Sequence, residues 1–443
     1  MAGDTIYALA SGGTPAGVAV IRMSGPGVRF GLETLIDSIP EPRRASLRTI
    51  RNASGEPVDR GLVLFFPGPA SFTGEDIAEF HLHGGRAVVA AVLDSLEGLP
   101  GFRAAEAGEF TRRAFETGRL DLSQVEGLAD LVAAETEAQR RQALQQAGGG
   151  LREACEGWRE RLVRARALLE AELDFPDEED VPGSVSDSAW ADVAAVSSEI
   201  GEALADSHRG ERLRDGFEVV VLGAPNAGKS SLINALARRD VAIVSEEPGT
   251  TRDVIEVRLD LGGYPVTVVD TAGLREAAGA IEREGMRRAA RRAEAADLVL
   301  WLEDMAGPVT EAKSPGGVRM IRIGTKADRV DSEEERTARA DRCEIVTSLV
   351  TGEGLDTLVG RLGEWARRAL GGRGAALVTR TRQRSALAGC RVALDEALGG
   401  ADRPLELRAE ELRRASDALG RVTGRVDVEE LLDVIFGEFC IGK

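Results

Sequence analysis

Hydrophobic residues follow different patterns in successive parts of the chain. In the first part, short apolar runs at residues 18–21 and 62–66 stand between stretches rich in Gly and Pro, which is typical of strands joined by turns. Across residues 120–214 Pro is scarce and apolar residues recur at helical spacing. The glycines at 148–150 are the expected break between two long helices. The pattern therefore predicts a mixed α+β part followed by a helical part.

A third pattern begins near residue 217. Short, almost continuously apolar runs are separated there by helical patterns, at residues 218–222, 266–269, 298–302, 320–323 and 344–346. Strands of this kind are buried on both faces, so they predict a parallel sheet covered by helices. Residues 255–261 instead alternate apolar and polar side chains and precede Gly262-Gly263. This segment predicts a hairpin, and therefore an antiparallel strand at one edge of the sheet.

The whole pattern predicts a multidomain fold. A length of 443 residues favours about three domains, because a single core rarely grows beyond about 250 residues. We expect an N-terminal α+β domain over 1–118, an all-α helical domain in two parts over 119–214 and 371–443, and an inserted α/β domain over 215–370. The insertion requires the two helical parts to pack together, so that the ends of the α/β domain lie close in space.

The composition is that of a folded, acidic protein. Hydrophobic residues make up 43% of the chain and charged residues 29%, which excludes global disorder. The chain has neither a run of about 18 apolar residues, as a membrane-spanning helix needs, nor a signal-peptide pattern, so the cytoplasm is the expected location. The net charge of −18 argues against non-specific coating of nucleic acid. The four cysteines lack metal-ligand spacing and are expected to be reduced thiols.

Lysine is rare, which draws attention to the positions where it occurs. Only four of the 56 basic residues are Lys, at positions 229, 313, 326 and 443. Where arginine supplies the ordinary positive charges, a retained lysine indicates a specific role. Lys313 stands in a loop-like Lys-Ser-Pro-Gly-Gly stretch and is expected at the surface. The other three lysines are candidate functional residues.

Residues 223–230 match the phosphate-binding loop pattern without a departure, with the sequence Gly-Ala-Pro-Asn-Ala-Gly-Lys-Ser. A buried strand is predicted before the loop and an apolar helical pattern after it, which makes a chance glycine-rich turn a weak alternative. Backbone N–H groups of such a loop surround phosphate oxygens, and the next helix adds its positive end. We expect Lys229 to reach the β- and γ-phosphates and Ser230 to coordinate Mg²⁺.

Two later motifs indicate that the nucleotide is GTP. Residues 270–273 (Asp-Thr-Ala-Gly) follow a predicted strand, where the Asp can hold magnesium through water and the Gly amide can contact the γ-phosphate. Residues 325–328 (Thr-Lys-Ala-Asp) follow another predicted strand. The Asp328 carboxylate can accept the N1–H and amine hydrogen bonds of guanine, which adenine does not offer. The Lys326 stem can lie over the base, and Ser348 can help to hold it.

Two residues depart from the usual guanine-nucleotide motifs. Thr325 stands where Asn is usual, and a hydroxyl replaces only part of the hydrogen bonding of an amide. Leu349 follows Ser348 where a small Ala is usual. Both departures predict weaker nucleotide affinity, but neither removes the Asp328 that selects guanine.

No local motif supplies the group that orients the attacking water. Residues 249–253 (Gly-Thr-Thr-Arg-Asp) lie where a switch loop supplies a Thr to Mg²⁺. Leu274, however, stands where Ras-like enzymes have the Gln that positions water. Three nearby glutamates are candidates for that role: Glu276, Glu282 and Glu284. No arginine finger can be assigned, and a bound monovalent cation can supply the same charge.

Further motifs run through the chain outside the nucleotide site. They are residues 4–6 (Asp-Thr-Ile), 21–25 (Ile-Arg-Met-Ser-Gly), 66–76 (Phe-Pro-Gly-Pro-Ala-Ser-Phe-Thr-Gly-Glu-Asp), 83–85 (His-Gly-Gly), 108–111 (Gly-Glu-Phe-Thr), 174–176 (Asp-Phe-Pro) and the terminal 439–443 (Phe-Cys-Ile-Gly-Lys). With these residues the chain resembles, over its whole length, the family of tRNA-modification GTPases known as MnmE or TrmE. The terminal segment and the Pro-Gly-Pro stretch are far more specific than the GTPase motifs.

The resemblance implies how the nucleotide site works. In the family, the nucleotide domains of a homodimer pair around K⁺, and the K⁺ positions that match are Asn226, Ser245, Glu247 and Thr250. The Mg²⁺ positions that match are Ser230 and Thr251, and Glu282 matches the catalytic glutamate that acts on the attacking water. The GTP-binding positions are Asn226, Ala227, Gly228, Lys229, Ser230, Ser231, Ser245, Thr250, Thr251, Asp270, Thr271, Ala272, Gly273, Thr325, Lys326, Asp328 and Ser348.

The resemblance also implies a second site and several partners. The N-terminal domain of the family binds a 5-formyl- or methylene-tetrahydrofolate and dimerises, and the matching folate positions are Arg22, Glu79, Arg119 and Lys443. Arg119 departs from the common Lys but keeps the charge. Together with a flavoprotein, MnmG or GidA, in a heterotetramer, family members add an aminomethyl or carboxymethylaminomethyl group to C5 of the wobble uridine of certain tRNAs. The folate supplies the one-carbon unit.

Several alternatives stay open. A GTPase of ribosome assembly is one, although such proteins usually carry a basic RNA-binding appendage and this chain is acidic. A scaffolding protein with a degenerate GTPase site is suggested only by Thr325 and Leu349. Cys440 is a candidate thiol nucleophile, with a buried packing thiol as the favoured reading. A basic stripe at residues 287–292 either contacts tRNA or a protein, or is a solvated helix face.

Overall fold

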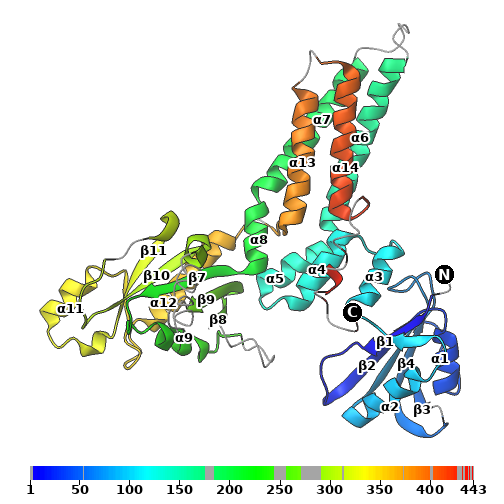
Figure 1. The fold of residues 1–443 in the computed structure, drawn as a ribbon, viewed down its shortest axis with the longest axis horizontal. Coiled ribbons are helices and arrows are strands. Elements are labelled where there is room, and N and C mark those ends of the chain that lie inside the picture. Colours follow the sequence, from blue (N-terminus) through cyan, green and yellow to red (C-terminus); the bar gives the residue numbers. More distant parts are fainter. Residues whose placement is uncertain are drawn as a thin grey trace, which may run out of the picture. The chain divides into compact units, whose positions relative to one another are not determined.

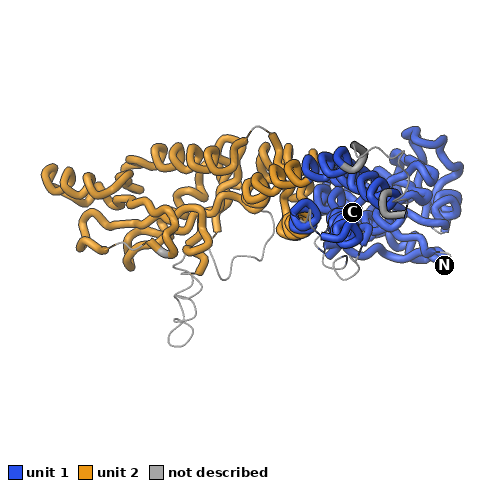
Figure 2. Tube along the Cα trace, turned by 90° about the horizontal axis from the view of Figure 1, so that it is seen from above, with its two compact units in different colours: residues 1–129, 146–196, 392–443 blue, residues 130–145, 197–391 orange. Residues whose placement is uncertain are grey.

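The chain folds into two compact units. The computed structural model describes residues 3–52, 54–174, 184–243, 256–270, 291–311, 314–372, 374–399, 403–426, 432, 435–437, 439 and 442. Unit 1 comprises Met1–Ala129, Gln146–Val196 and Val392–Lys443, and unit 2 comprises Asp130–Gln145 and Ser197–Arg391 (Figure 2). The predicted multidomain fold, with α+β, helical and α/β parts, is confirmed. The boundaries expected at residues 118, 214 and 370 stay predictions.

Unit 1 begins with a six-stranded sheet. Its strands are β1 (Thr5–Leu9), β2 (Ala16–Ser24), β3 (Ser46–Arg51), β4 (Pro57–Phe66), β5 (Ile77–Gly84) and β6 (Phe102–Ala104), in the order β3-β4-β5-β2-β1-β6. Neighbouring strands are antiparallel except β1 and β6. Helices α1 (Val28–Leu35) and α2 (Arg86–Glu97) pack on one face, where they cover inward side chains such as Ile21 and Phe80. Because side chains alternate along a strand, Arg22 and Glu79 lie on the opposite face.

The helical part of the chain is formed by segments far apart in the sequence. Its helices are α3 (Glu109–Glu116), α4 (Leu122–Ala133), α5 (Glu137–Ala147), α6 (Gly150–Asp174), α7 (Ser184–Ala205), α8 (Ser207–Asp215), α13 (Thr381–Leu398) and α14 (Leu405–Thr423). The break predicted at 148–150 is confirmed, because α5 ends and α6 begins there. Helices α6 and α14 lie side by side in unit 1 (Figure 1). This is the packing that an inserted α/β domain requires.

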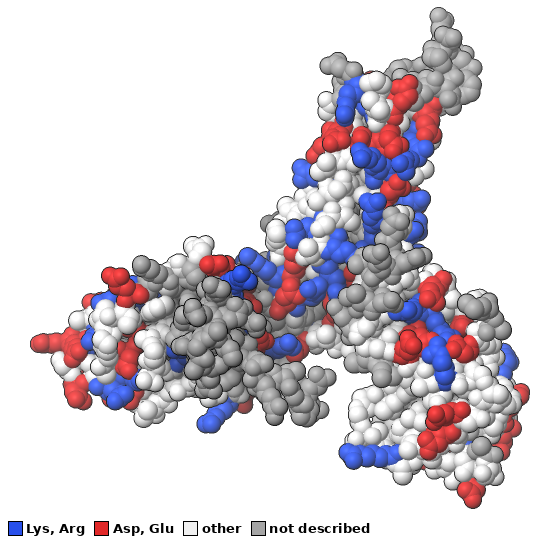
Figure 3. Space-filling model, viewed as in Figure 1, with Lys and Arg blue, Asp and Glu red and all other residues white. Residues whose placement is uncertain are grey.

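Charged side chains on these helices are balanced locally. Arg413 pairs with Glu410 and Asp417 on α14, and Arg166 pairs with Glu170 on α6. Figure 3 shows acidic and basic side chains intermixed over this part of the visible face. Such a surface does not concentrate one sign of charge, as a site that tracks nucleic-acid phosphates does. Within the described ranges, no helix is both long and apolar enough to cross a membrane.

Unit 2 contains the predicted parallel sheet. Its strands are β7 (Phe217–Gly223), β8 (Glu256–Leu261), β9 (Tyr264–Asp270), β10 (Leu298–Asp304), β11 (Met320–Thr325) and β12 (Ile345–Val346), in the order β12-β11-β10-β7-β9-β8. All neighbours are parallel except β8 and β9, which form the hairpin expected from the sequence. Helices α9 (Lys229–Ala237), α11 (Glu333–Ala340) and α12 (Leu355–Leu370) belong to this unit.

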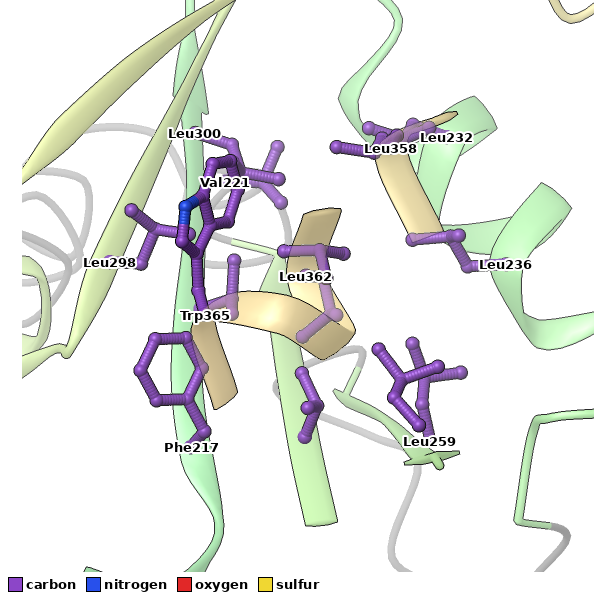
Figure 4. Close-up of a cluster of buried hydrophobic side chains, with 14 of the residues drawn as sticks. Phe217, Val221, Leu232, Leu236, Leu259, Leu298, Leu300, Leu358, Leu362 and Trp365 are labelled. Carbon is purple, nitrogen blue, oxygen red and sulfur yellow. The ribbon is translucent and has the colours of Figure 1, made fainter. Parts of the chain in front are cut away.

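Both faces of this sheet are buried, as the continuous apolar runs predict. On one face, Leu362 and Trp365 of α12 and Leu232 of α9 pack against strand residues such as Val221 and Leu300 (Figure 4). A second buried cluster on the other face contains strand residues Val220, Val269 and Val299. Strand β7 lies between its two parallel neighbours, β9 on one side and β10 on the other. The carboxyl end of β7 is therefore a topological switch point, where α/β sheets bind their ligands.

Candidate functional site

The phosphate-binding loop connects β7 to α9 at this switch point. Two positions need glycine: Gly228 has φ 92°, and a Cβ on Gly223, at φ 148°, would lie 2.4 Å from the Leu302 carbonyl oxygen. The Lys229 side chain is buried, and its Nζ donates to the carbonyl oxygens of Gly223, at 3.1 Å, and Ala224, at 2.8 Å. The loop therefore curls around the ammonium group that the sequence assigns to the β- and γ-phosphates.

Two oxygen donors meet beside the loop. The Ser230 hydroxyl, in the first turn of α9, donates a 2.7 Å hydrogen bond to Oδ2 of Asp270. Asp270 is the last residue of β9 and is fully buried. Hydroxyl and carboxylate oxygens are the ligands that Mg²⁺ prefers, with water and phosphate completing the coordination. The pair fits the Mg²⁺ site expected from the sequence.

The guanine-reading motif is tied directly to the phosphate-binding loop. The Thr325 hydroxyl donates to the Ala227 carbonyl oxygen at 2.8 Å and lies 3.2 Å from the Glu303 carbonyl oxygen. Lys326, at φ 56°, donates from Nζ to the Asn226 carbonyl oxygen at 2.6 Å. The departure at Thr325 thus keeps one connection between the two motifs. The hydrogen bond from the Thr325 hydroxyl to the Ala227 carbonyl oxygen makes that connection.

Asp304 is a member of this site that the sequence did not single out. Its Oδ2 accepts a 2.7 Å hydrogen bond from Lys326 Nζ. Burial raises the pKa of Asp304, but hydrogen bonds from Lys326 and from the Ala306 amide, with the charge of Lys326, outweigh it and hold that pKa below its usual value. The available signal was an acidic residue at the end of a predicted strand, the same signal that marks Asp270.

Asp328 and Lys326 line a cavity of about 280 Å³, where the sequence predicts the guanine base. Ser348 donates to Asp328 Oδ1 at 2.5 Å and accepts from the Val350 and Thr351 amides, so its side chain holds the Asp328 carboxylate in place. Leu349 lines this cavity, so the replacement of the usual Ala by Leu changes one apolar side chain in the cavity wall. The cavity is lined by Gly228, Ser231, Leu232, Thr325, Lys326, Asp328, Arg329, Thr347, Leu349 and Val350.

Several predicted site residues lie outside the described part of the chain. In the nucleotide domain they are Ser245, Glu247, Thr250, Thr251, Thr271, Ala272, Gly273 and Glu282. In the terminal segment they are Cys440 and Lys443. Their roles stay predictions. The described nucleotide residues, from Asn226 to Ser348, converge at the carboxyl ends of β7, β9, β11 and β12.

A second constellation lies on the outer face of the sheet in unit 1. Arg22 on β2 and Glu79 on β5 are directly opposite each other, with Arg22 Nη2 2.9 Å and Nε 3.0 Å from Glu79 Oε1. His81 Nε2 lies 3.4 Å from the other oxygen of Glu79. Arg119 follows α3 with an exposed side chain, which makes no ion pair among the described residues. The structure thus brings together two of the four predicted folate residues.

The described part of the C-terminal tail packs against other segments of unit 1. Phe436 and Phe439 pack with Leu122 of α4, and a Cβ on Gly442, at φ 99°, would lie 2.3 Å from the Leu9 carbonyl oxygen at the end of β1. The neighbouring β1 residue, Ala8, is paired with Arg22 in the sheet. Gly442 therefore lies beside β1, the strand next to the one that carries Arg22.

Comparison with known proteins agrees with this arrangement. The family descriptions "GTP-binding protein TrmE N-terminus" and "MnmE helical domain" match residues 5–119 and 122–440. The tRNA modification GTPase MnmE of Brucella anthropi is 57% identical over 440 residues, 99% of this chain and 98% of that protein. The protein of the same name from Rhizobium johnstonii is 54% identical over 443 residues, the full length of both. Among solved structures, Aquifex aeolicus Era matches at 21% identity over 40% of this chain and 66% of that chain, with a TM-score of 0.28.

The family is therefore shown by full-length similarity and by two family matches that together cover most of the chain. The motifs that carried the sequence resemblance include residues on both described constellations. The chain belongs to the MnmE family of tRNA modification GTPases.

Proposed function

We propose that this protein is a K⁺-dependent, GTP-hydrolysing switch that acts in the modification of tRNA. With a flavoprotein partner of the MnmG or GidA type, in a heterotetramer in the cytoplasm, it adds a carboxymethylaminomethyl or aminomethyl group at C5 of the wobble uridine of certain tRNAs. A tetrahydrofolate supplies the one-carbon unit. The full-length likeness to proteins named tRNA modification GTPase MnmE supports this assignment.

One observation carries the GTPase part of the proposal. The Asp328 carboxylate, the residue that selects guanine over adenine, is held by Ser348 in the wall of a cavity that Lys326 and the phosphate-binding loop also line. A carboxylate placed there accepts two hydrogen bonds from guanine and is left unpaired by adenine. The tether from Thr325 to Ala227 fixes the distance between the base-reading and phosphate-binding parts of the site.

Hydrolysis in this proposal depends on charge and positioning. Ser230 and Thr251 hold Mg²⁺, which neutralises charge on the phosphates when it is bound. Glu282 orients the attacking water in place of the glutamine that Leu274 replaces. Asn226, Ser245, Glu247 and Thr250 hold K⁺, which supplies the charge of an arginine finger. Two copies of the nucleotide domain pair across this site in the homodimer, which couples hydrolysis to domain closure.

The folate part rests on the second constellation. Arg22, Glu79, Arg119 and Lys443 bind a 5-formyl- or methylene-tetrahydrofolate. Glu79 is an acceptor that suits the donor edge of a pterin ring, and the basic groups suit its carbonyl and the glutamate tail. Gly442, the described residue that precedes Lys443 in the sequence, lies beside the end of β1 in the same unit. Cys440, in the same tail, is a packing thiol in this proposal, with a nucleophile as the alternative.

GTP turnover measured in K⁺ and in Na⁺ at equal ionic strength tests the proposal. We expect strong K⁺ dependence in the wild type and loss of turnover in Glu282→Ala. Equal rates in the two salts would remove the roles assigned to Asn226 and its loop. Retention of 5-formyl-tetrahydrofolate by the purified protein separates this function from a ribosome-assembly GTPase, and absence of GTP turnover would favour a scaffolding protein.

A further inference from the structure

Hydrogen bonds of polar side chains, some of them buried, hold the loop between β4 and β5 in place. Thr73 is fully buried, and its hydroxyl lies 2.7 Å from the Ser24 hydroxyl. The Thr73 carbonyl oxygen accepts a 2.8 Å hydrogen bond from the Thr117 hydroxyl. Asp76 Oδ1 accepts from the Gly68 amide at 2.8 Å, which closes the loop on itself. A loop with so many internal partners has little freedom to rearrange.

An ion-pair network fixes the same loop to the N-terminus and to α3. Arg113 of α3 lies 3.1 Å from Glu75 in the loop, 2.9 Å from Asp4 and 3.0 Å from Glu109. Arg103 also pairs with Asp4 and Glu109. Hydrogen bonds from Arg103 hold the pKa of Asp4 below its usual value despite partial burial. Three motifs that are distant in sequence therefore combine to position one loop.

This rigid loop exposes an aromatic ring beside the Arg22–Glu79 pair. Phe72 lies between buried Ser71 and Thr73, yet 37% of its surface is exposed. The Arg22 guanidinium carbon lies 5.9 Å from the centroid of the Phe72 ring and 5.7 Å from that of the fully buried Phe110. An apolar ring kept in water by a preorganised loop is a feature of binding sites, because the ordering cost is met before the ligand arrives.

We propose that Phe72 is the stacking surface of the folate site, against which the flat pterin ring lies while Glu79 accepts the hydrogen bonds of its donor edge. This inference rests on the proposed folate function and adds a residue to it. When Glu79 binds the ligand and no longer pairs with Arg22, cation–π contacts with the Phe72 and Phe110 rings still hold the Arg22 guanidinium. Thr73 acts as a positioning residue, because its hydrogen bonds hold the loop that presents the ring.

Binding of 5-formyl-tetrahydrofolate to the full-length protein, measured by titration calorimetry, tests the proposal. Phe72→Leu keeps apolar bulk but removes the ring, and we expect its Kd to rise about tenfold, the loss of one stacking contact. Phe72→Trp keeps a ring and should bind within about twofold of the wild type. The matched control is Phe30→Leu, an exposed aromatic on α1, 46% exposed, which should leave both Kd and GTP turnover unchanged.

Thr73→Val removes the hydroxyl that contacts Ser24, and we expect a several-fold weaker Kd that Thr73→Ser restores. If the wild type binds the folate and Phe72→Leu binds it equally well, the stacking role is wrong and the folate function stands. If the wild type itself does not bind, the folate function fails. If Phe72→Leu instead changes the oligomeric state seen by light scattering while Kd is unchanged, the ring packs against a second copy and the inference is overturned.

Discussion

The nucleotide site of unit 2 and the Arg22 face of unit 1 are built in different ways. Side chains of the nucleotide site lie at the carboxyl ends of parallel strands, in the last strand residues, the loops that follow and the first turn of α9. Each motif contributes residues adjacent in sequence, such as 223–230 and 325–328. Arg22 and Glu79 lie within strands and face each other across the sheet, 57 residues apart in the chain. Binding groups in the first case depend on loop geometry, and in the second on strand register.

In both sites the polar groups already have partners within the protein. Lys229 donates to loop carbonyl oxygens, Ser230 donates to Asp270, and Arg22 pairs with Glu79. A ligand must therefore exchange hydrogen bonds with the protein, which limits the net gain from each contact. Binding is favourable where the hydrogen bonds made to the ligand are stronger in sum than those that the protein gives up. The comparison predicts that the two sites fail independently when their own residues are changed.

The largest effect is expected from Lys229→Ala. Removal of the ammonium group that the loop surrounds should weaken GTP binding and turnover at least about 100-fold, because it leaves the phosphate charge without its main partner. Affinity for 5-formyl-tetrahydrofolate should not change. GTP turnover and nucleotide binding measure the first effect, and calorimetry measures the second. Lys313→Ala is the control, and a similar loss there would show that the effect is not specific to the loop.

Glu79→Gln should affect the other site alone. The amide keeps the size of the side chain but loses the charge that pairs with Arg22, so we expect the Kd for 5-formyl-tetrahydrofolate to rise about tenfold or more. GTP turnover should stay at the wild-type value. The matched control is Glu41→Gln, whose side chain is 74% exposed and pairs only with Arg44 among described residues. A fall in GTP turnover with Glu79→Gln would contradict independence.

Thr325→Val tests the tether between the two nucleotide motifs. The valine has nearly the same shape but cannot donate to the Ala227 carbonyl oxygen, so we expect a GTP Kd about five- to tenfold higher, the worth of one hydrogen bond. Thr325→Ser should restore binding. Thr325→Asn addresses the prediction that the departure weakens affinity: tighter binding than the wild type would support it, and equal binding would show that the hydroxyl suffices.

The smallest effect concerns the ion-pair network of unit 1. Burial raises the pKa of Glu109, but hydrogen bonds from Arg103, the Glu106 amide and Arg113 outweigh it, so that pKa lies below the usual 4.5. The stabilisation is therefore complete above pH 4.5 and is lost as the pH falls through the lower, folded-state pKa. Glu109→Gln should lower local stability by about 1–2 kcal/mol at pH 7.

Hydrogen exchange of α3, compared between variant and wild type at the same pH, measures this difference. It should shrink as the pH falls below 4.5, because the carboxylate of the open state then takes up a proton before the folded one does. Glu116→Gln, an exposed change at the end of the same helix, is the control and should leave exchange unchanged at both pH values. A difference that persists at low pH would show that shape at position 109, rather than charge, holds the network together.

Prediction from sequence succeeded where information is local. The apolar runs of unit 2 become strands because a strand buried on both faces needs continuous hydrophobic residues, and the hairpin at Gly262-Gly263 follows from alternation and turn residues. The phosphate-binding loop was recognisable because its backbone conformation requires glycine at fixed spacing. Asp304 was missed because its partner, Lys326, directly follows the neighbouring strand β11, and the pairing of β10 with β11 brings the two residues together.

The sequence by itself determined the fold class of each part of the chain, the strands of the unit 2 sheet, the guanine-nucleotide motifs and the family, because these depend on periodicity and on contiguous residues. Tertiary structure decided what the remaining motif residues do. Asp4, Glu75 and Glu109 belong to separate motifs, and the fold joins them through Arg113 into one network that fixes the loop carrying Phe72. It also places Arg22 opposite Glu79. Strand register and packing determine these contacts, and a single linear sequence does not show which distant residues will share them.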